Sequence, residues 1–293
     1  ISDFLKVALA MSPNVDLAKI LDERVPALES MIDQLTFSKD LYDFLFSGID
    51  LPCLVEYEGK DDIKDDIRKK MIIFIEYFYR KEGSIPNLSD FKLGNIVFAA
   101  MLAEKQLNFQ ASLICFMEFC GVNLDRFQII QSTESISYLV GVLKNGALLP
   151  NEAAVVLTRS NDFISKTFQL PKPLTAAEIR NICSHELAGK TKFLIGREVL
   201  PAAGAEALEC IDRSDAIIYG AGTPYSSLLP SLELIGMGDR IKLAKGPKIL
   251  VANLMKETSN TISAVDLIRM TLEFLKKSVI GKNKYNPRDY ITH

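Results

Sequence analysis

Apolar residues in the first 120 positions recur at the spacing of an amphipathic helix. The opening segment ISDFLKVALAM follows this pattern, and so do residues 25–46 and 61–79. Residues 93–101 place apolar side chains at i, i+3, i+4, i+7 and i+8, which predicts a helix with one buried stripe. A second apolar helix is expected over residues 108–120, with Gly121 as its C-terminal stop.

The charged run DDIKDDIRKK, residues 61–70, opens one of these helices. Its acids and bases alternate at helical spacing, so we expect a solvated helix face with ion pairs one turn apart. The preceding residues 47–59 contain Gly48 and Pro52 and end on a glycine, which predicts a connection between two helices.

After Gly141 the apolar runs become shorter and are separated by Gly, Pro, Asn and Ser. Four runs are expected to be strands, at residues 153–157, 192–195, 215–219 and 248–253. Helical patterns precede the last two of them, over residues 202–213 and 226–244. Such alternation implies βαβ units, and unbroken apolar strands are typical of a parallel sheet that is covered on both faces.

These patterns predict an α/β protein with a doubly wound, mostly parallel sheet and a helical elaboration in the first half. Because the change in composition is gradual, we expect a single domain over residues 1–293. Its helix-rich part covers about residues 1–140, and its strand–helix alternating part covers about residues 141–280.

Composition and charge narrow the function classes. The chain is 48% apolar, has a formal charge of −3 and a pI near 5.6, which argues against nucleic-acid binding because that normally needs a basic excess. No apolar run approaches the roughly 18 residues that span a bilayer, and no signal-peptide pattern opens the chain. We therefore expect a cytoplasmic protein without membrane contact; whether it forms a homo-oligomer stays open.

Cysteine and histidine spacing does not indicate a metal site. The five cysteines lack a CxxC pair and are expected to be reduced core residues: Cys53, Cys115, Cys120, Cys183 and Cys210. The two histidines, His185 and His293, lie far apart. GxSxG, GxxxxGK[ST] and strand-following GxGxxG motifs are absent from the sequence, so hydrolysis by a Ser–His–Asp triad and Walker-type ATP hydrolysis are not expected.

The segment SDAIIYGAGTPYSSLLPS, residues 214–231, is the main candidate for chemistry. We expect a buried strand that feeds a loop of small residues and then a helix start, where backbone N–H groups favour an anion. The residues that would serve a phosphate-bearing ligand are Gly220, Gly222, Thr223, Ser226 and Ser227. The alternative is an ordinary strand-to-helix turn.

Three further residues, in two segments, are candidates for ligand contact. Asn253 follows the last predicted strand and would line the same cleft, whereas Ser263 with Asp266 predicts a helix N-cap nearby. Gly94 and Asn95 stand in the first turn of the helix at residues 93–101, where the asparagine can cap, face solvent or meet a ligand.

Four segments follow one another along the chain in a recognisable order: DFKLGNIVFAAM, NGALLPNEAAVVL, SDAIIYGAGTPYSSLLPSLELIGMGDRI and PKILVANLM. In this order they resemble the CofD-like 2-phospho-L-lactate transferase family, which includes the YvcK-type gluconeogenesis-factor proteins. The family's helix start is roughly GHSLGN, its loop roughly GPGSLYTSxxPN, and its next strand ends in a pattern like NLM. The resemblance covers about residues 88–274.

The resemblance implies a Rossmann-like three-layer fold that binds a nucleotide-type ligand at the carboxyl edge of the sheet. Its enzyme branch transfers a phosphorus-containing group with Mg²⁺, and its YvcK branch binds nucleotide sugars as a regulator. Matched by position, Gly94 and Asn95 correspond to the GN of the helix motif. Asn253 corresponds to the strand-end asparagine, and the small residues of 220–227 correspond to the phosphate loop.

The chain also departs from the family pattern. The family's GGGTG loop and DDGG motif are absent, so the metal ligands and catalytic residues stay unassigned. Either a glycine-rich segment belongs upstream, as Ile1 in place of a methionine suggests, or the site has degenerated. Asp90, Phe91 and Lys92 replace the GHS of the helix motif. Ala221 and Ser231 replace the usual proline and asparagine of the loop.

Three functions remain open on these grounds. The first is a nucleotide or nucleotide-linked phosphometabolite-binding protein that transfers a phosphorus-containing group, and the second is a non-catalytic nucleotide-sugar-binding regulator. The third is an interaction protein whose helical opening, about residues 1–79, docks a partner.

Overall fold

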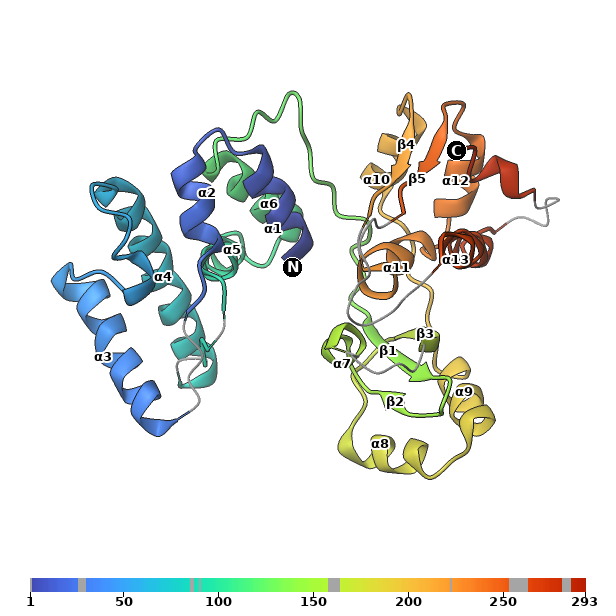
Figure 1. The fold of residues 1–293 in the computed structure, drawn as a ribbon, viewed down its shortest axis with the longest axis horizontal. Coiled ribbons are helices and arrows are strands. Elements are labelled where there is room, and N and C mark those ends of the chain that lie inside the picture. Colours follow the sequence, from blue (N-terminus) through green and yellow to red (C-terminus); the bar gives the residue numbers. More distant parts are fainter. Residues whose placement is uncertain are drawn as a thin grey trace. The chain divides into compact units, whose positions relative to one another are not determined.

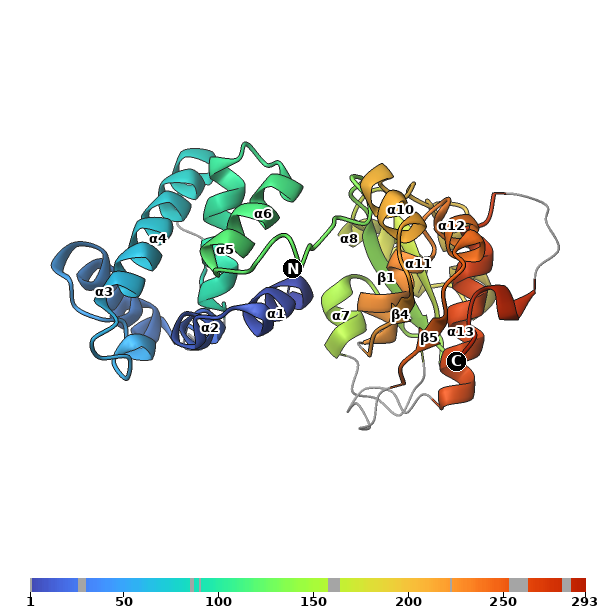
Figure 2. The same cartoon turned by 90° about the horizontal axis from the view of Figure 1, so that it is seen from above.

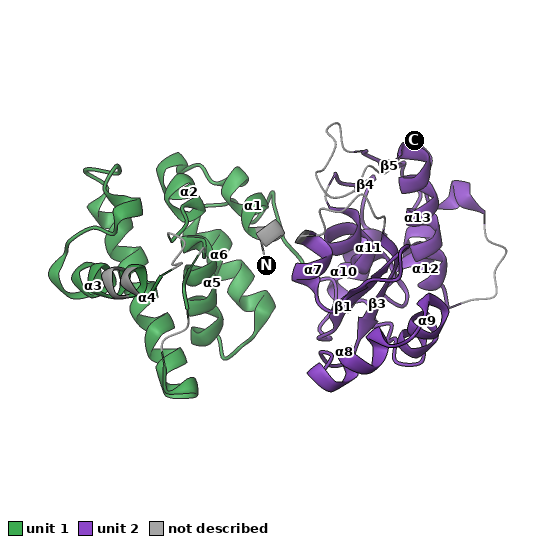
Figure 3. Ribbon diagram, turned by 60° about the horizontal axis from the view of Figure 1, so that its bottom comes forward, with its two compact units in different colours: residues 1–130 green, residues 131–293 purple. Residues whose placement is uncertain are grey.

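The fold is described from a computed structural model of the chain (Figure 1). It describes residues 2–25, 30–84, 87–89, 91–157, 164–221, 223–252, 263–280 and 286–293. Contacts within the chain group it into two compact units, residues 1–130 and residues 131–293 (Figure 3). This boundary lies near the predicted change from helix-rich to alternating sequence.

Unit 1 is helical in its described part, as the apolar spacing predicts. Its elements are α1 (Ser2–Met11), α2 (Val15–Asp22), α3 (Met31–Ser47), the 3-10 turn η1 (Pro52–Leu54), α4 (Asp61–Glu82), α5 (Leu93–Glu104) and α6 (Phe109–Phe119). Side-chain caps begin several of them: the Asn108 side chain accepts from the N–H of Ala111 at 2.9 Å at the start of α6. Gly121, with φ +71°, follows α6, which confirms the predicted stop.

Most charged side chains of the run at the start of α4 are exposed, and one is buried. Arg68 pairs with Asp65 and Lys69 with Asp66, one turn apart, as expected. Lys64 is instead only 3% exposed and pairs with Asp50 of the preceding connection. The expectation of a wholly solvated face was therefore wrong for Lys64, because α4 packs that side against the connection.

Unit 2 mixes helices and strands. Its elements are β1 (Tyr138–Leu143), β2 (Leu148–Leu149), α7 (Glu152–Leu157), β3 (Ile164–Leu170), α8 (Ala176–Cys183), α9 (Leu187–Ile195), α10 (Ala205–Asp212), β4 (Ile217–Tyr219), the π-helical turn η2 (Pro224–Leu228), α11 (Leu229–Leu232), α12 (Met237–Leu243), β5 (Lys248–Leu250), α13 (Ala264–Lys277) and the 3-10 turn η3 (Pro287–Asp289). The chain is thus a mixed α/β protein, which confirms the predicted class.

The described strands form two small sheets. β1 lies in the middle of an antiparallel sheet of order β2-β1-β3, and the Asn145-Gly146 turn, with Gly146 at φ +88°, joins β1 to β2. β4 and β5 pair in parallel with the register Ile217↔Lys248, as predicted for these two runs. In Figures 1 and 2 they lie side by side next to α12 and α13.

Two of the four expected strands are helices instead. Residues 153–157 form most of α7, whose start is capped by the Asn151 side chain, which accepts from the Ala154 N–H at 2.9 Å. Residues 192–195 end α9, which buries Lys190 and Leu194 on one side. A short apolar run has no decisive period, so capping and packing decided its form. The expected helix at 226–244 is broken, because Gly236 adopts φ +91° between α11 and α12.

Three smaller predictions have outcomes in the structure. The Ser263 side chain accepts from the Asp266 N–H at 3.1 Å, which confirms the N-cap of α13. All five cysteines are free, but Cys183 and Cys210 are exposed, so the expectation that they lie in the core was wrong for these two. Within the described residues, no helix combines the length and apolarity needed to cross a membrane.

Candidate functional site

The parallel pairing of β4 and β5 brings the carboxyl ends of both strands to one edge. The Val251 N–H donates to the Tyr219 carbonyl at 3.0 Å, so the two strands leave the sheet together. The Tyr219 hydroxyl is buried and donates to the Tyr290 carbonyl at 2.6 Å, which fixes the end of β4. Ligands in open α/β sheets bind at this edge, and the loop that starts at Gly220 stands there.

Gly220 borders open space at the end of β4, as far as the described residues define it. It is exposed, its φ lies outside the left-handed region, and a Cβ at this position would meet no atom of the described residues within 4 Å. The backbone turn therefore does not require glycine at position 220. What the glycine contributes is room for another molecule to approach the backbone.

The loop then enters the helical turn η2. The Ser227 N–H donates to the Thr223 carbonyl at 2.9 Å, and the Leu229 N–H donates to the Pro224 carbonyl in the wider π-helical pattern. The first N–H groups of a helix have no partner within it, and at this position they belong to Tyr225 and Ser226. Single π-helical turns occur frequently at functional sites. These N–H groups and the half-buried hydroxyls of Ser226 and Ser227 are the polar groups that the start of η2 offers.

Tyr225 anchors this turn to the rest of unit 2. Its hydroxyl donates to the Ile164 carbonyl of β3 at 3.1 Å and lies 3.7 Å from the Met270 sulfur of α13. Burial raises the pKa of Tyr225 to about 12, so the phenol stays protonated at neutral pH. The sequence prediction missed this role, although an aromatic residue among small loop residues is a usable signal.

The predicted site residues fall into three groups. Gly220, Thr223, Ser226 and Ser227 lie together on the loop and turn after β4. Gly222 and Asn253 lie outside the described residues. Gly94 and Asn95 stand at the start of α5 in unit 1, whereas the loop belongs to unit 2.

Gly94 is required by packing within unit 1. A Cβ at this position would lie 2.9 Å from the Leu21 backbone oxygen of α2, so only glycine fits without a shift. The Leu93 N–H donates to the Glu23 carbonyl at 2.9 Å, which closes the start of α5 against the end of α2. The neighbouring Asn95 Oδ1 is buried and has no hydrogen-bond partner within the described part of unit 1.

Within the part of the chain that the structure describes, no cluster of side chains is placed to hold a metal ion by itself. Mg²⁺ prefers oxygen ligands that include one or two carboxylates. The stretch 220–231 contains no acidic residue, and the described ranges contain no group of three or more His, Cys, Asp and Glu side chains placed to hold a metal. We therefore derive no step through a metal ion.

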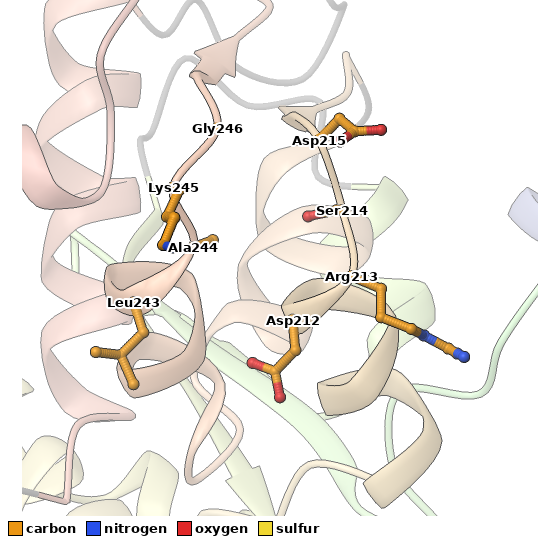
Figure 4. A pocket seen from close by; sticks show the side chains of 8 residues that line it. All are labelled: Asp212, Arg213, Ser214, Asp215, Leu243, Ala244, Lys245 and Gly246. Carbon is orange, nitrogen blue, oxygen red and sulfur yellow. The ribbon is translucent and has the colours of Figure 1, made fainter.

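A separate pocket of about 510 Å³ opens at the other end of β4 and β5 (Figure 4). Residues 212–215 and 243–246 line it, just before each strand begins. Asp212 pairs there with Arg240 at 2.9 Å, and Figure 4 shows Arg213 and Asp215 pointing to the side away from Leu243. The pocket thus lies at the amino ends of the strands, opposite the Gly220 loop, and does not belong to the predicted site.

The sequence profile of the family described as 2-phospho-L-lactate transferase CofD matches residues 27–286. A gluconeogenesis factor from Listeria monocytogenes is 34% identical over 223 residues, which are 75% of this chain and 58% of that protein. A gluconeogenesis factor from Listeria innocua is 22% identical over 223 residues, which are again 75% of this chain and 58% of that protein. The chain therefore spans about 58% of the length of these curated relatives.

Solved structures of low sequence identity also resemble the chain. A crystal structure of a UPF0052 family member from Bacillus halodurans is 19% identical, with a TM-score of 0.47 over 75% of this chain and 65% of that one. Another crystal structure of a Bacillus halodurans protein is 18% identical, with a TM-score of 0.48 over 97% of this chain and 79% of that one.

Proposed function

Because the chain belongs to the 2-phospho-L-lactate transferase CofD family, we propose that it binds a nucleotide or nucleotide-linked phosphometabolite through the loop after β4. One observation carries the proposal: the β4–β5 pair sets Gly220 and η2 at its carboxyl edge, with open space beside the glycine. Phosphate would meet the N–H groups of Tyr225 and Ser226 there.

The loop would bind a phosphate through neutral hydrogen-bond donors and not through positively charged side chains. The hydroxyls of Thr223, Ser226 and Ser227 add donors to the N–H groups at the helix start. Since the stretch 220–231 carries no charged side chain, binding depends on aligned dipoles and hydrogen bonds. Such a loop recognises the phosphate and leaves the choice of base to other residues, among which we propose Asn253.

We further propose that β4 and β5 belong to a Rossmann-like, mostly parallel sheet within one domain. Two features support this. The strands pair in parallel with helices between them in sequence, and Tyr219 and Leu250 pack from the pair toward α12 and α13. Ile218 on the opposite face is 63% exposed, which is unusual for a parallel strand and leaves an apolar face for further structure.

Two kinds of activity are compatible with ligand binding at this loop. The family description supports transfer of a phosphorus-containing group, in which the loop would position the phosphate and stabilise its charge. The second candidate is a non-catalytic regulator. It is favoured by the 34% identity to a protein named gluconeogenesis factor, and by a loop that offers donors but no acid or base.

A calorimetric titration with UDP-, GDP- and ADP-linked ligands tests the binding proposal. Unfolding of the protein in the presence of the ligand gives a second measurement. A ligand at 100 times its Kd should raise the free energy of unfolding by about 2.7 kcal/mol. In Gly220→Val, the new side chain enters the open space where the phosphate would approach. We expect this variant to fold normally and to lose at least about tenfold in affinity, roughly 1.4 kcal/mol.

The matched control is Gly196→Val at the end of α9. Gly196 also lies in unit 2, has φ −66°, and a Cβ there would make only ordinary contacts at 3.5 Å or more. Equal affinity of Gly220→Val and the wild type would reject the site. Retained binding with no product in a transfer assay would favour the regulator.

A further inference from the structure

The helix α3 carries exposed apolar side chains opposite its buried face. The side that faces the core of unit 1 is formed by Phe37, Leu41 and Phe44. On the outer side, Tyr42 is 60% exposed, Phe46 is 68% exposed, and Ile49 just beyond the helix is 58% exposed. We name Tyr42, Phe46 and Ile49 the aromatic patch.

The aromatic patch is held in a defined shape. The rings of Tyr42 and Phe46 stand one helical turn apart, with centroids separated by 5.0 Å. Gly48 ends α3 in the left-handed conformation, and the Ile49 N–H then donates to the Asp43 carbonyl at 3.3 Å. Ordered aromatic groups of this kind are enriched at the centres of protein interfaces.

The chain around the patch is strongly acidic. Residues 40–66, from α3 through the connection to the start of α4 (Figure 1), contain nine carboxylates and two lysines. Both lysines are already paired, Lys60 with Asp16 and Lys64 with Asp50. Exposed carboxylates that form no ion pair among the described residues are Glu56, Glu58, Asp61 and Asp62.

Among the described residues, the cations next to this stretch in sequence do not cancel its charge. On α4, Arg68 and Lys69 are paired with Asp65 and Asp66 of the same helix. Lys39 is exposed one turn before Tyr42 and adds a single positive charge at the far end of the patch. The C-terminal end of α3 therefore carries an exposed apolar surface, and the chain that follows it directly is acidic and exposed.

We propose that the aromatic patch docks a basic amphipathic helix of a partner protein. Apolar side chains at i and i+4 of that helix would cover Tyr42 and Phe46, and its Lys and Arg residues would meet the unpaired carboxylates of the connection. Charge complementarity favours a basic helix over an acidic or neutral one, because only a basic helix would pair with these carboxylates. The proposal is independent of the phosphate loop in unit 2.

Two synthetic amphipathic helices with one common apolar face test the proposal on the full chain. One carries Lys and Arg on its polar face, and the other carries Glu at the same positions. We expect the basic peptide to bind in fluorescence anisotropy, more weakly as salt is added, and the acidic peptide not to bind. The double variant Tyr42→Ser/Phe46→Ser should lose at least about tenfold in affinity.

Two controls separate the surface from general effects. Tyr79→Ser removes a tyrosine of α4 that is 61% exposed but lies outside the patch, and it should bind the basic peptide like the wild type. Glu56→Gln/Glu58→Gln keeps the apolar surface and should reduce both the affinity and its salt dependence. Equal binding of the two peptides, or unchanged binding by the double serine variant, would overturn the proposal. So would a dimer in light scattering that the double variant dissociates, since the patch would then bind a second copy.

Discussion

The carboxylate of Glu233, which follows α11, lies 3.1 Å from the ammonium of Lys277 on α13. The Glu233 side chain is about 1% exposed, and its other oxygen accepts from Gln169 of β3 at 2.7 Å. Lys277 also reaches Glu198 at 3.2 Å. This polar contact ties the antiparallel sheet of unit 2 to the helices that pack beside β4 and β5.

Breaking this pair should be costly. Burial raises the pKa of Glu233, and Lys277 and Gln169 oppose that rise. Lys277→Met leaves the buried carboxylate without its cation, so we expect a loss of about 3–5 kcal/mol in the free energy of unfolding. Urea unfolding followed by circular dichroism measures it. The exposed pair Arg240–Asp212 gives the control, since Arg240→Met should cost less than about 1 kcal/mol.

Packing at Gly94 can be tested with one methyl group. Gly94→Ala forces a Cβ to within 2.9 Å of the Leu21 backbone oxygen, and we expect a loss of about 1–3 kcal/mol in unfolding experiments. Gly220→Ala meets no atom within 4 Å and should stay within about 0.5 kcal/mol of the wild type. A neutral Gly94→Ala variant would show that α5 does not approach α2 this closely.

Stability at acidic pH should depend on Glu178. Its carboxylate pairs with Arg197 and accepts from the N–H and hydroxyl of Thr175 at the start of α8, which lowers its pKa from 4.5 to about 2. A carboxyl whose pKa is lowered by folding contributes stability above its unfolded pKa and loses it as the pH falls. The contribution should thus disappear between about pH 4.5 and 2.

The Glu178→Gln variant checks the sign of this effect. Urea midpoints measured from pH 6 downward should fall less steeply for Glu178→Gln than for the wild type within that window. Glu209→Gln, at an exposed position of α10, serves as the control and should follow the wild-type curve. Parallel curves for all three proteins would contradict the capping role of Glu178.

Thr167 offers a substitution that should raise, not lower, the free energy of unfolding. This residue of β3 is 1% exposed, and its hydroxyl has no hydrogen-bond partner within the described structure. Thr167→Val removes a buried polar group at nearly constant shape, so we expect a gain of about 1–2 kcal/mol in the free energy of unfolding. Thr191→Val on α9 is the comparison, because its hydroxyl already donates to the Leu187 carbonyl at 2.8 Å and should give no gain.

Most helices of unit 1 could be predicted because their signals are local, although α2 was not among the expected elements. The apolar stripe at residues 93–101 and the Asn108 cap each lie within one or two turns of the backbone they direct, and Gly121 ends α6 through its own φ. The run at residues 153–157 was mistaken for a strand because five apolar residues fit either form. Its choice of helix depends on the Asn151 cap.

The amino-acid sequence by itself determined the family and the mixed α/β class, because these depend on residue order and local backbone preference. The phosphate-binding role of the loop after β4 stays a prediction. Only the tertiary structure decided which polar groups are buried and paired, such as Lys64 with Asp50 and Glu233 with Lys277. It likewise showed that Gly94 is needed for helix packing and that Gly220 borders open space. These properties arise from contacts between residues far apart in the chain, where close packing and desolvation act and no local pattern records them.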